Sequence, residues 1–186
     1  MVLTITAVPV ADLSGVADLE MCSDDANYIV VGASVTNSGG ILWSTSGDGS
    51  FVDNTVLNPT YVPGSTDRSS GSVDLTMTVS GNGSCLPDND IITLNLTPAP
   101  TADAGSDAEV CGTDVFDITG RGSIGGSASS ATWSTSGTGS FDNAGAFGVS
   151  TTYTPSAADL IAGSVTLTLT TDDPIGDCGA VNDAMV

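Results

Sequence analysis

Apolar and polar residues alternate with a period of two along much of this chain, which is the pattern of β-strands that bury one face. The clearest alternation covers residues 163–171, where valine and leucine take turns with threonine. Segments 2–6 and 92–96 alternate in the same way. Clusters of Gly, Ser, Asp and Asn separate the alternating segments and indicate turns. We therefore predict an all-β protein whose strands have one buried face and one face exposed to solvent.

The second half of the chain shows most clearly which elements to expect. The pattern predicts strands over 107–111, 115–123, 131–136, about 151–154 and 163–171. A last strand should pair with the strand at 163–171 as a hairpin. Residues 157–162 are the only helix-like stretch. Long helices are not expected, because Glu occurs only twice and Lys and Gln do not occur at all.

An internal repeat organises the chain. Residues 43–51 read WSTSGDGSF and residues 133–141 read WSTSGTGSF, so eight of nine positions are identical. The match extends to other pairs of positions: Cys22 with Cys111, Tyr61 with Tyr153, Gly71 with Gly163, and Cys85 with Cys178. A fixed spacing of this kind indicates tandem structural units of about 90 residues each, close to the size of a β-sandwich domain.

The ends of the repeat divide the chain into three parts. Residues 8–12 (VPVAD) match residues 99–103 (APTAD), and each follows an alternating segment. We assign residues 1–7 to the last strand of a preceding repeat, residues 8–98 to repeat 1, and residues 99–186 to a repeat 2 that lacks its final strand. Because Met185-Val186 repeats Met1-Val2, we hypothesise that the chain is a window of a longer array and that Met1 is not an initiator.

The charge of the chain excludes several classes of partner. Twenty-two acidic and two basic residues give a formal net charge of -20. A nucleic-acid-binding or anionic-membrane-binding protein needs a basic surface, which Arg68 and Arg121 alone do not supply. No apolar run approaches the roughly 20 residues of a membrane span. We expect neither nucleic-acid binding nor membrane insertion.

The order Cys, Trp, Cys within one repeat resembles Ig-like domains, and ADAG at 102–105 with the later W-x-x-x-G-x-G resembles PKD domains. A narrower resemblance rests on longer strings: TADAGSDAEVCG, ATWSTSGTGSF, TYTPSAADLIAGSVTLTLTT and CGAVNDAMV. They are similar to the tandem PKD-like or Ig-like repeats of giant Bacteroidota surface adhesins, including gliding-motility adhesins exported by type IX secretion. The resemblance covers both repeats and is stronger for the second. It implies tandem β-sandwich domains in a linear array, secretion to the bacterial cell surface, and a role in adhesion or surface filaments.

Four cysteines permit three connectivities. The repeat favours Cys22 with Cys85 and Cys111 with Cys178, since this treats both units alike. Each bridge would then close a loop of more than 60 residues and stabilise its unit by about 4 kcal/mol in the loop-entropy model. The first cysteine lies farther ahead of the Trp than in true Ig domains, so the bridge would be a peripheral staple. A rival pairing joins Cys85 to Cys111 across the repeat boundary and leaves Cys22 and Cys178 to bond neighbouring units.

Four aromatic residues occupy matching positions in the two repeats. Trp43 and Trp133 could stack on sugars, but a Trp on the third strand of a sandwich is far more often a core residue, which is the interpretation we adopt. Tyr61 and Tyr153 each precede a Pro by two positions. We expect them to pack at a strand end, with the hydroxyl groups bonded to backbone.

Clustered aspartates are the candidate metal ligands. The residues assigned to a Ca²⁺ site are Asp103, Asp107, Asp172, Asp173 and Asp177. Carboxylate oxygens suit Ca²⁺, which takes six to eight oxygen ligands. No EF-hand spacing is present, so solvated loop acids are the competing interpretation. No other cofactor is expected.

No catalytic residues are expected, because the chain has no His or Lys and no positioned acid–base pair. The sequence therefore favours a non-enzymatic repeat segment of an extracellular adhesin or filament, which acts as a stalk or spacer and has neighbouring repeats as its partners. One alternative is that each repeat is a module that binds surface glycans or proteins. Another is a homo-oligomeric filament in which residues 1–7 complete repeat 2 of another copy by donor-strand exchange.

Overall fold

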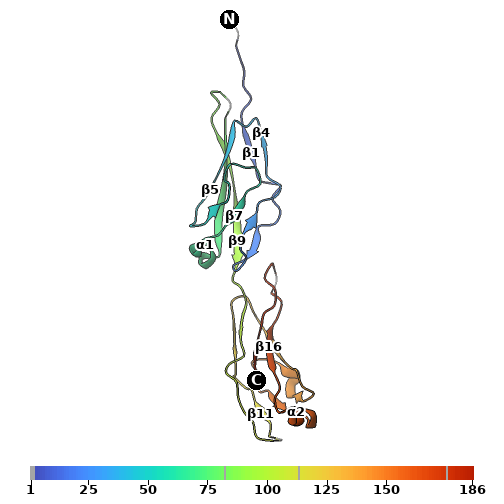
Figure 1. Ribbon diagram of the computed structural model, residues 1–186. Helices are drawn as coiled ribbons and strands as arrows, with labels where there is room; N and C mark the ends of the chain where they lie inside the picture. The colour runs from blue at the N-terminus through green and yellow to red at the C-terminus, as the bar shows by residue number, and fades with distance from the viewer. Residues whose placement is uncertain (1–2, 82, 113, 175) are drawn as a thin grey trace. The chain divides into compact units, whose positions relative to one another are not determined.

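The computed structural model describes residues 3–81, 83–112, 114–174 and 176–186 (Figure 1). The chain divides into two compact units, Met1–Pro98 (unit 1) and Ala99–Val186 (unit 2). Strands in several small sheets form nearly all of the regular structure, which confirms the predicted all-β class. Among the described residues, no helix is long and apolar enough to cross a membrane.

Unit 1 is sandwich-like and contains one short helix. Its elements are β1 (Val10–Asp12), β2 (Glu20–Cys22), β3 (Tyr28–Ile29), β4 (Ser34–Thr36), β5 (Gly40–Thr45), β6 (Ser50–Phe51), β7 (Thr60–Val62), α1 (Ser65–Ser70), β8 (Ser72–Ser80) and β9 (Asp88–Thr97). The sheets have the orders β2-β9-β8-β5, β3-β7-β6 and β1-β4. The pairing of β2 with β9 is parallel, and the other pairings are antiparallel.

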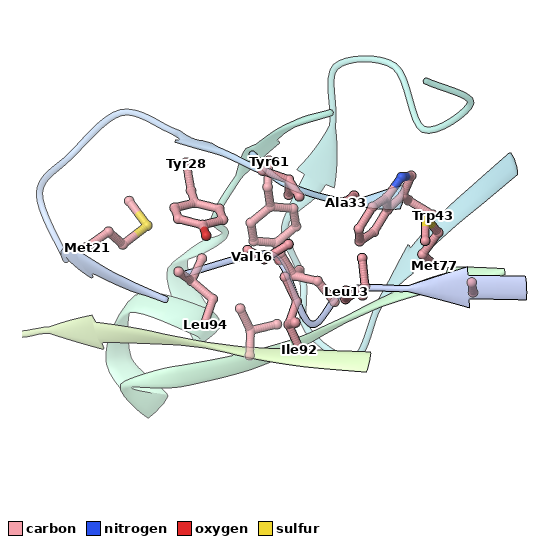
Figure 2. Close-up of a cluster of buried hydrophobic side chains, with 14 of the residues drawn as sticks. Leu13, Val16, Met21, Tyr28, Ala33, Trp43, Tyr61, Met77, Ile92 and Leu94 are labelled. Atoms are coloured by element: carbon pink, nitrogen blue, oxygen red, sulfur yellow. The ribbon is translucent and has the colours of Figure 1, made fainter. Parts of the chain in front are cut away.

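Alternation along β8 builds the core of unit 1. Val73, Leu75, Met77 and Val79 are buried, and the residues between them face outward. The neighbouring strand β5 places Trp43 directly opposite Met77. Figure 2 shows Trp43 and Met77 together at one end of the buried cluster. The period of two seen in the sequence is therefore the period of burial.

Unit 2 has a corresponding order of elements. They are β10 (Thr101–Asp103), β11 (Phe116–Asp117), β12 (Ser123–Gly125), β13 (Ala131–Thr135), β14 (Ser140–Phe141), a 3₁₀ turn η1 (Asp142–Gly145), β15 (Thr152–Thr154), α2 (Ala157–Ala162), β16 (Leu167–Thr171) and β17 (Asn182–Met185). The sheets have the orders β10-β12, β11-β15-β14 and β13-β16-β17. The buried cluster consists of Ala104, Ile118, Ala131, Trp133, Tyr153, Leu167, Leu169 and Met185.

Several strands differ from the sequence prediction at the edges of unit 2. Residues 107–111, all of them described, form no strand, and β16 begins at Leu167 rather than at 163. A final strand is present in part, because β17 pairs with β16 as an antiparallel hairpin. In unit 1, the strand that corresponds to 107–111 is β2, and it pairs with the second half of β9. Unit 2 has no counterpart of that half, so its would-be neighbours have nothing to pair with.

The segment 1–7 is not a strand where the structure describes it. Residues 3–7 are exposed and lie outside every strand, and the first strand begins at Val10. Met1 and Val2, which the sequence assigns to this segment, lie outside the described residues. An alternating segment forms a strand only where a partner supplies hydrogen bonds and a face to cover, and unit 1 supplies neither here.

Helix α1 is absent from the sequence prediction because Ser, Thr and Asp are weak helix formers. Its two ends explain it. The Asp67 carboxylate in its first turn accepts the backbone N–H of Gly64, and Gly71 ends the helix with a left-handed φ of 78°. These are local capping interactions that stabilise even a short helix. In unit 2, α2 covers the predicted residues 157–162 and ends at Gly163 in the same way.

Candidate functional site

A buried tyrosine–aspartate pair is the most elaborate polar arrangement in unit 1. The Tyr61 hydroxyl donates to Oδ2 of Asp67 at 2.6 Å, and Oγ1 of Thr45 lies 2.9 Å from the same hydroxyl. Tyr61 and Asp67 are both buried. A buried carboxylate needs partners for its remaining lone pairs, so the surroundings of Asp67 decide whether the pair is stable.

Backbone N–H groups satisfy the Asp67 carboxylate. Asp48 donates to Oδ1 at 3.2 Å, while Gly49 and Gly64 donate to Oδ2 at 3.0 and 2.9 Å. Asp48 and Gly49 belong to the turn between β5 and β6, and Gly64 precedes α1. The carboxylate therefore joins the β5–β6 turn to the start of the helix. We call the Tyr61–Asp67 pair, with these backbone donors, the brace.

Unit 2 repeats the brace. The Tyr153 hydroxyl donates to Oδ2 of Asp159 at 2.8 Å and accepts from Oγ1 of Thr135 at 3.1 Å. Backbone N–H groups of Thr138 and Ser156 donate to Asp159 at 2.9 and 2.8 Å. The Ser156 hydroxyl accepts in return from the backbone of Asp159, which closes a capping box at the start of α2.

The electrostatics keep the proton of each brace on its tyrosine. Burial, aided by the Asp67 hydrogen bond, raises the pKa of Tyr61 to about 12. Burial raises the pKa of Tyr153 as well. The backbone hydrogen bonds from Ser156 and Thr138 hold the pKa of Asp159 well below its ordinary value. A neutral phenol beside an ionised carboxylate at neutral pH is a structural arrangement, because neither group is near a pKa suited to proton transfer.

The tyrosines correct one sequence expectation. Their hydroxyls donate to aspartate carboxylates and not to the backbone, and Asp67 and Asp159 did not figure among the candidate residues. The signal was available, since each aspartate follows its tyrosine by six positions in both repeats. The tryptophans lie in the cores of their units, and the Trp43 indole N–H donates to the Val56 carbonyl oxygen at 3.1 Å.

The candidate calcium ligands do not come together. No group of three or more acidic, His or Cys side chains suited to a metal occurs among the described residues. Asp103 accepts the backbone N–H of Gly105, and Asp107 accepts that of Val186. Asp172 accepts two backbone N–H groups and a hydroxyl from residues 129–130, which lowers its pKa. These three carboxylates bind their own chain. No hydrogen bond of Asp173 or Asp177 is described.

The cysteines do not form the two bridges predicted within the repeats. Cys22 and Cys178 are disulfide-bonded, whereas Cys85 and Cys111 carry free thiols. In unit 1, Cys22 lies opposite Thr97 at the end of β9, while Cys85 precedes the start of that strand. Ten residues of strand span roughly 30 Å, and a disulfide needs Cα atoms within about 7 Å. The sandwich therefore holds Cys22 and Cys85 too far apart to bond.

A groove of about 1010 Å³ opens on unit 2. It lies between the strandless segment that contains Val110 and the residues that lead into β16, with Tyr153 and Leu167 at its base. Its apolar lining includes Val110, Phe116, Leu160, Val165, Met185 and Val186. Sequence reasoning did not identify this groove, because it depends on where β17 ends.

No protein-family model matches the chain. No curated protein matches it either.

Proposed function

We propose that this chain is a structural segment of an extracellular bacterial surface adhesin or filament, in which Ig-like or PKD-like β-sandwich repeats follow one another in a linear array as spacers. The observation that carries the proposal is what the two units have in common. The residues that repeat between them are the core Trp, the brace and the Gly-containing turns that the brace ties down. The repeat therefore preserves a scaffold and no exposed recognition surface.

The surface of the chain supports a spacer. With 22 acidic and two basic side chains, neighbouring molecules repel one another, which keeps a crowded surface layer soluble. A disulfide is typical of oxidising compartments and so favours secretion. Neither unit presents a cluster of exposed aromatic or basic residues of the kind that dominates binding hot spots, as far as the described residues show.

The ends of unit 1 are tied together in a way that suits a load-bearing link. The chain enters through β1 and leaves through β9. Carboxylates of Asp88 and Asp90 on β9 accept the backbone N–H groups of Ala11 and Leu13 at 3.0 and 2.9 Å. Because β9 is also paired along its length with β8, tension at either end is spread over many hydrogen bonds.

Unit 2 has the same type of tie. Asp183 on β17 accepts the backbone N–H of Ala104 at 2.8 Å. Ala104 follows β10 as Leu13 follows β1, so Asp183 has the role of Asp90. The two units thus share the contact that fixes the first strand to the last.

Force spectroscopy on the intact, reduced chain tests the proposal. A spacer should unfold in discrete steps, each releasing on the order of 90 residues, or roughly 30 nm of extended chain. Asp90→Ala should lower the unfolding force of unit 1, whereas Asp53→Ala, which removes only the local turn contact of Asp53 with Thr55, should not. Extension without discrete steps would contradict a load-bearing role. Specific binding on a glycan array would favour the alternative of a recognition module.

A further inference from the structure

The last strand of unit 2 is shorter than the last strand of unit 1. Met185 lies opposite Leu167 in β17, just as Ile92 lies opposite Leu75 in β9, so the two positions correspond. Strand β17 ends there, whereas β9 continues to Thr97. The groove on unit 2 lies where the second half of β9 lies in unit 1. Unit 1 therefore shows what kind of segment fits the groove of unit 2.

In unit 1, this half of β9 completes the core. Leu94 and Leu96 are 0% and 2% exposed, and Figure 2 shows Leu94 pointing from its strand into the buried cluster. Met21 on the neighbouring β2 is 3% exposed, but the corresponding Val110 in unit 2 is 41% exposed. The segment before β16 is likewise strandless, although its counterpart in unit 1 begins β8. Unit 2 thus has an unfilled strand position with apolar walls.

The chain also carries an exposed segment of the matching pattern. Residues 3–6 read Leu-Thr-Ile-Thr, and the segment 94–97 that fills unit 1 reads Leu-Asn-Leu-Thr. Leu3 and Ile5 are 81% and 87% exposed, although alternating apolar residues of this kind are normally covered. Figure 1 shows this segment extending away from the unit 1 sandwich. Each segment precedes the first strand of the following unit by the same four residues, at Val10 and at Thr101.

We propose that the groove of unit 2 binds residues 3–6 of a second copy of this chain as an added β-strand. Leu3 takes the place of Leu94 opposite Val165, and Ile5 takes the place of Leu96 between Val110 and the start of β16. Burying the two side chains supplies the hydrophobic driving force. Pairing with an exposed strand position supplies backbone hydrogen bonds, as in other cases of strand addition.

The register follows from unit 1. There, Asn95 N–H donates to the Leu19 carbonyl, and Leu96 N–H donates to the Gly71 carbonyl. The corresponding acceptors in unit 2 are the carbonyl oxygens of residues 108 and 163. They would receive the N–H groups of residues 4 and 5 of the second copy. This register leaves Thr6 at the rim, beside Cys111, as Thr97 lies beside Cys22 in unit 1.

The free thiols give the proposal a covalent readout. The Cys85 sulfur lies 3.6 Å from the carbonyl oxygens of Thr6 and Ala7 in its own chain. When Thr6 docks at the rim of the groove, Cys85 of the donor therefore comes close to Cys111 of the acceptor. Oxidised glutathione can convert these two thiols to one disulfide and is reduced to two glutathione thiols. The bond forms between copies only if the strand has docked.

This inference deepens the proposed function by naming how repeats join, and it is tested separately from load bearing. The first experiment measures self-association of the reduced full chain by sedimentation velocity across a wide concentration range. We expect concentration-dependent oligomers, and Leu3→Asp should weaken association by about tenfold or more, because it places a charge in an apolar groove. Leu86→Asp is the matched control, since Leu86 is 84% exposed but lies outside the segment. A monomer at all concentrations, or equal effects of the two variants, would overturn the proposal.

The second experiment uses complementary cysteine variants. Cys111→Ser keeps the donor thiol Cys85, and Cys85→Ser keeps the acceptor thiol Cys111. Mixed and treated with oxidised glutathione, they should give a covalent heterodimer on a non-reducing gel, and peptide mapping should locate the bond at Cys85 and Cys111. Adding Leu3→Asp to the donor should abolish the product while leaving both thiols in place. An undiminished yield would mean collision of exposed thiols without strand docking and would refute the inference. Either failure leaves stepwise unfolding under force untouched.

Discussion

At the scale of single residues, the same solution to a buried charge is used in both units. The carboxylates of Asp67 and Asp159 are removed from solvent, yet each accepts a tyrosine hydroxyl and at least two backbone N–H groups. A buried carboxylate with fewer partners would lose several kcal/mol of solvation without compensation. The brace is therefore stabilising only as a complete set, and removing one member should affect the others.

Replacing the hydroxyl donor tests this in unit 1. Tyr61→Phe should lower the free energy of unfolding by about 1–3 kcal/mol, because it removes a hydrogen bond to a buried charged group. Urea unfolding can be followed through Trp43 in a Trp133→Phe background, which leaves one tryptophan as the reporter of unit 1. The matched control is Tyr153→Phe in the same background, which alters only unit 2. An unchanged midpoint for Tyr61→Phe would mean that the brace contributes nothing net.

The raised pKa of Tyr61 predicts a loss of stability in alkali. The folded state favours the neutral phenol, so its contribution is complete below the unfolded pKa near 10 and is lost as pH rises toward about 12. Unfolding free energies measured from pH 8 to about 11.5 should fall more steeply for the Trp133→Phe background than for Tyr61→Phe in that background. Parallel curves would show that another group controls the alkaline transition.

The lowered pKa of Asp159 predicts the opposite behaviour in acid. The folded state favours the carboxylate, so its contribution is complete above the unfolded value near 3.8 and is lost as pH falls below it. Asp159→Asn should therefore flatten the acid limb of unit 2 unfolding, observed through Trp133 in a Trp43→Phe background. Asp142 has no resolved pKa displacement, so Asp142→Asn serves as a surface control. Equal flattening in the two variants would contradict the assignment.

At the scale of elements, the length of a strand decides how well sequence predicts it. The nine residues of β8 alternate long enough to reveal both the strand and its buried face. Two-residue strands such as β3 and β14 contain no full period, so their pairing depends on neighbours and not on pattern. Helix α1 was invisible for another reason, since a carboxylate cap and a closing glycine outweigh the poor helix propensity of its residues.

The turn between β5 and β6 requires a residue without a Cβ. At Gly47, an added Cβ would lie 1.6 Å from Oδ1 of Asp67, so the brace and the side chain are mutually exclusive. Gly47→Ala should destabilise unit 1 by about 1–3 kcal/mol, because it displaces a buried carboxylate from its donors. Gly179→Ala is the control, since a Cβ there meets nothing within 4 Å. Thermal unfolding of the two variants should differ clearly; similar melting temperatures would argue against the tight packing of this turn.

At the scale of the whole molecule, repeat symmetry predicted composition better than connectivity. Treating the units alike paired Cys22 with Cys85, although the sandwich places them at opposite ends of a ten-residue strand. Sequence spacing carries no information about which end of a strand a loop occupies until the topology is known. The groove escaped prediction for the same reason. Its existence depends on β17 stopping at Met185, which becomes meaningful only beside the longer β9.

The whole-molecule charge and the occupied carboxylates together predict how cations act on the chain. A net charge of -20 opposes the compact state, so any added cation should raise the melting temperature by screening. Asp103, Asp107 and Asp172 already accept hydrogen bonds from their own chain, and Ca²⁺ would have to displace these donors. We therefore expect Ca²⁺ and Mg²⁺ at equal concentration to raise the melting temperature equally, with chelator reversing both effects. Because Mg²⁺ dehydrates reluctantly and prefers a smaller octahedral site, a larger shift with Ca²⁺ would reveal a specific site formed by rearrangement of these loops. Loss of that excess in Asp172→Asn would then place Asp172 among its ligands.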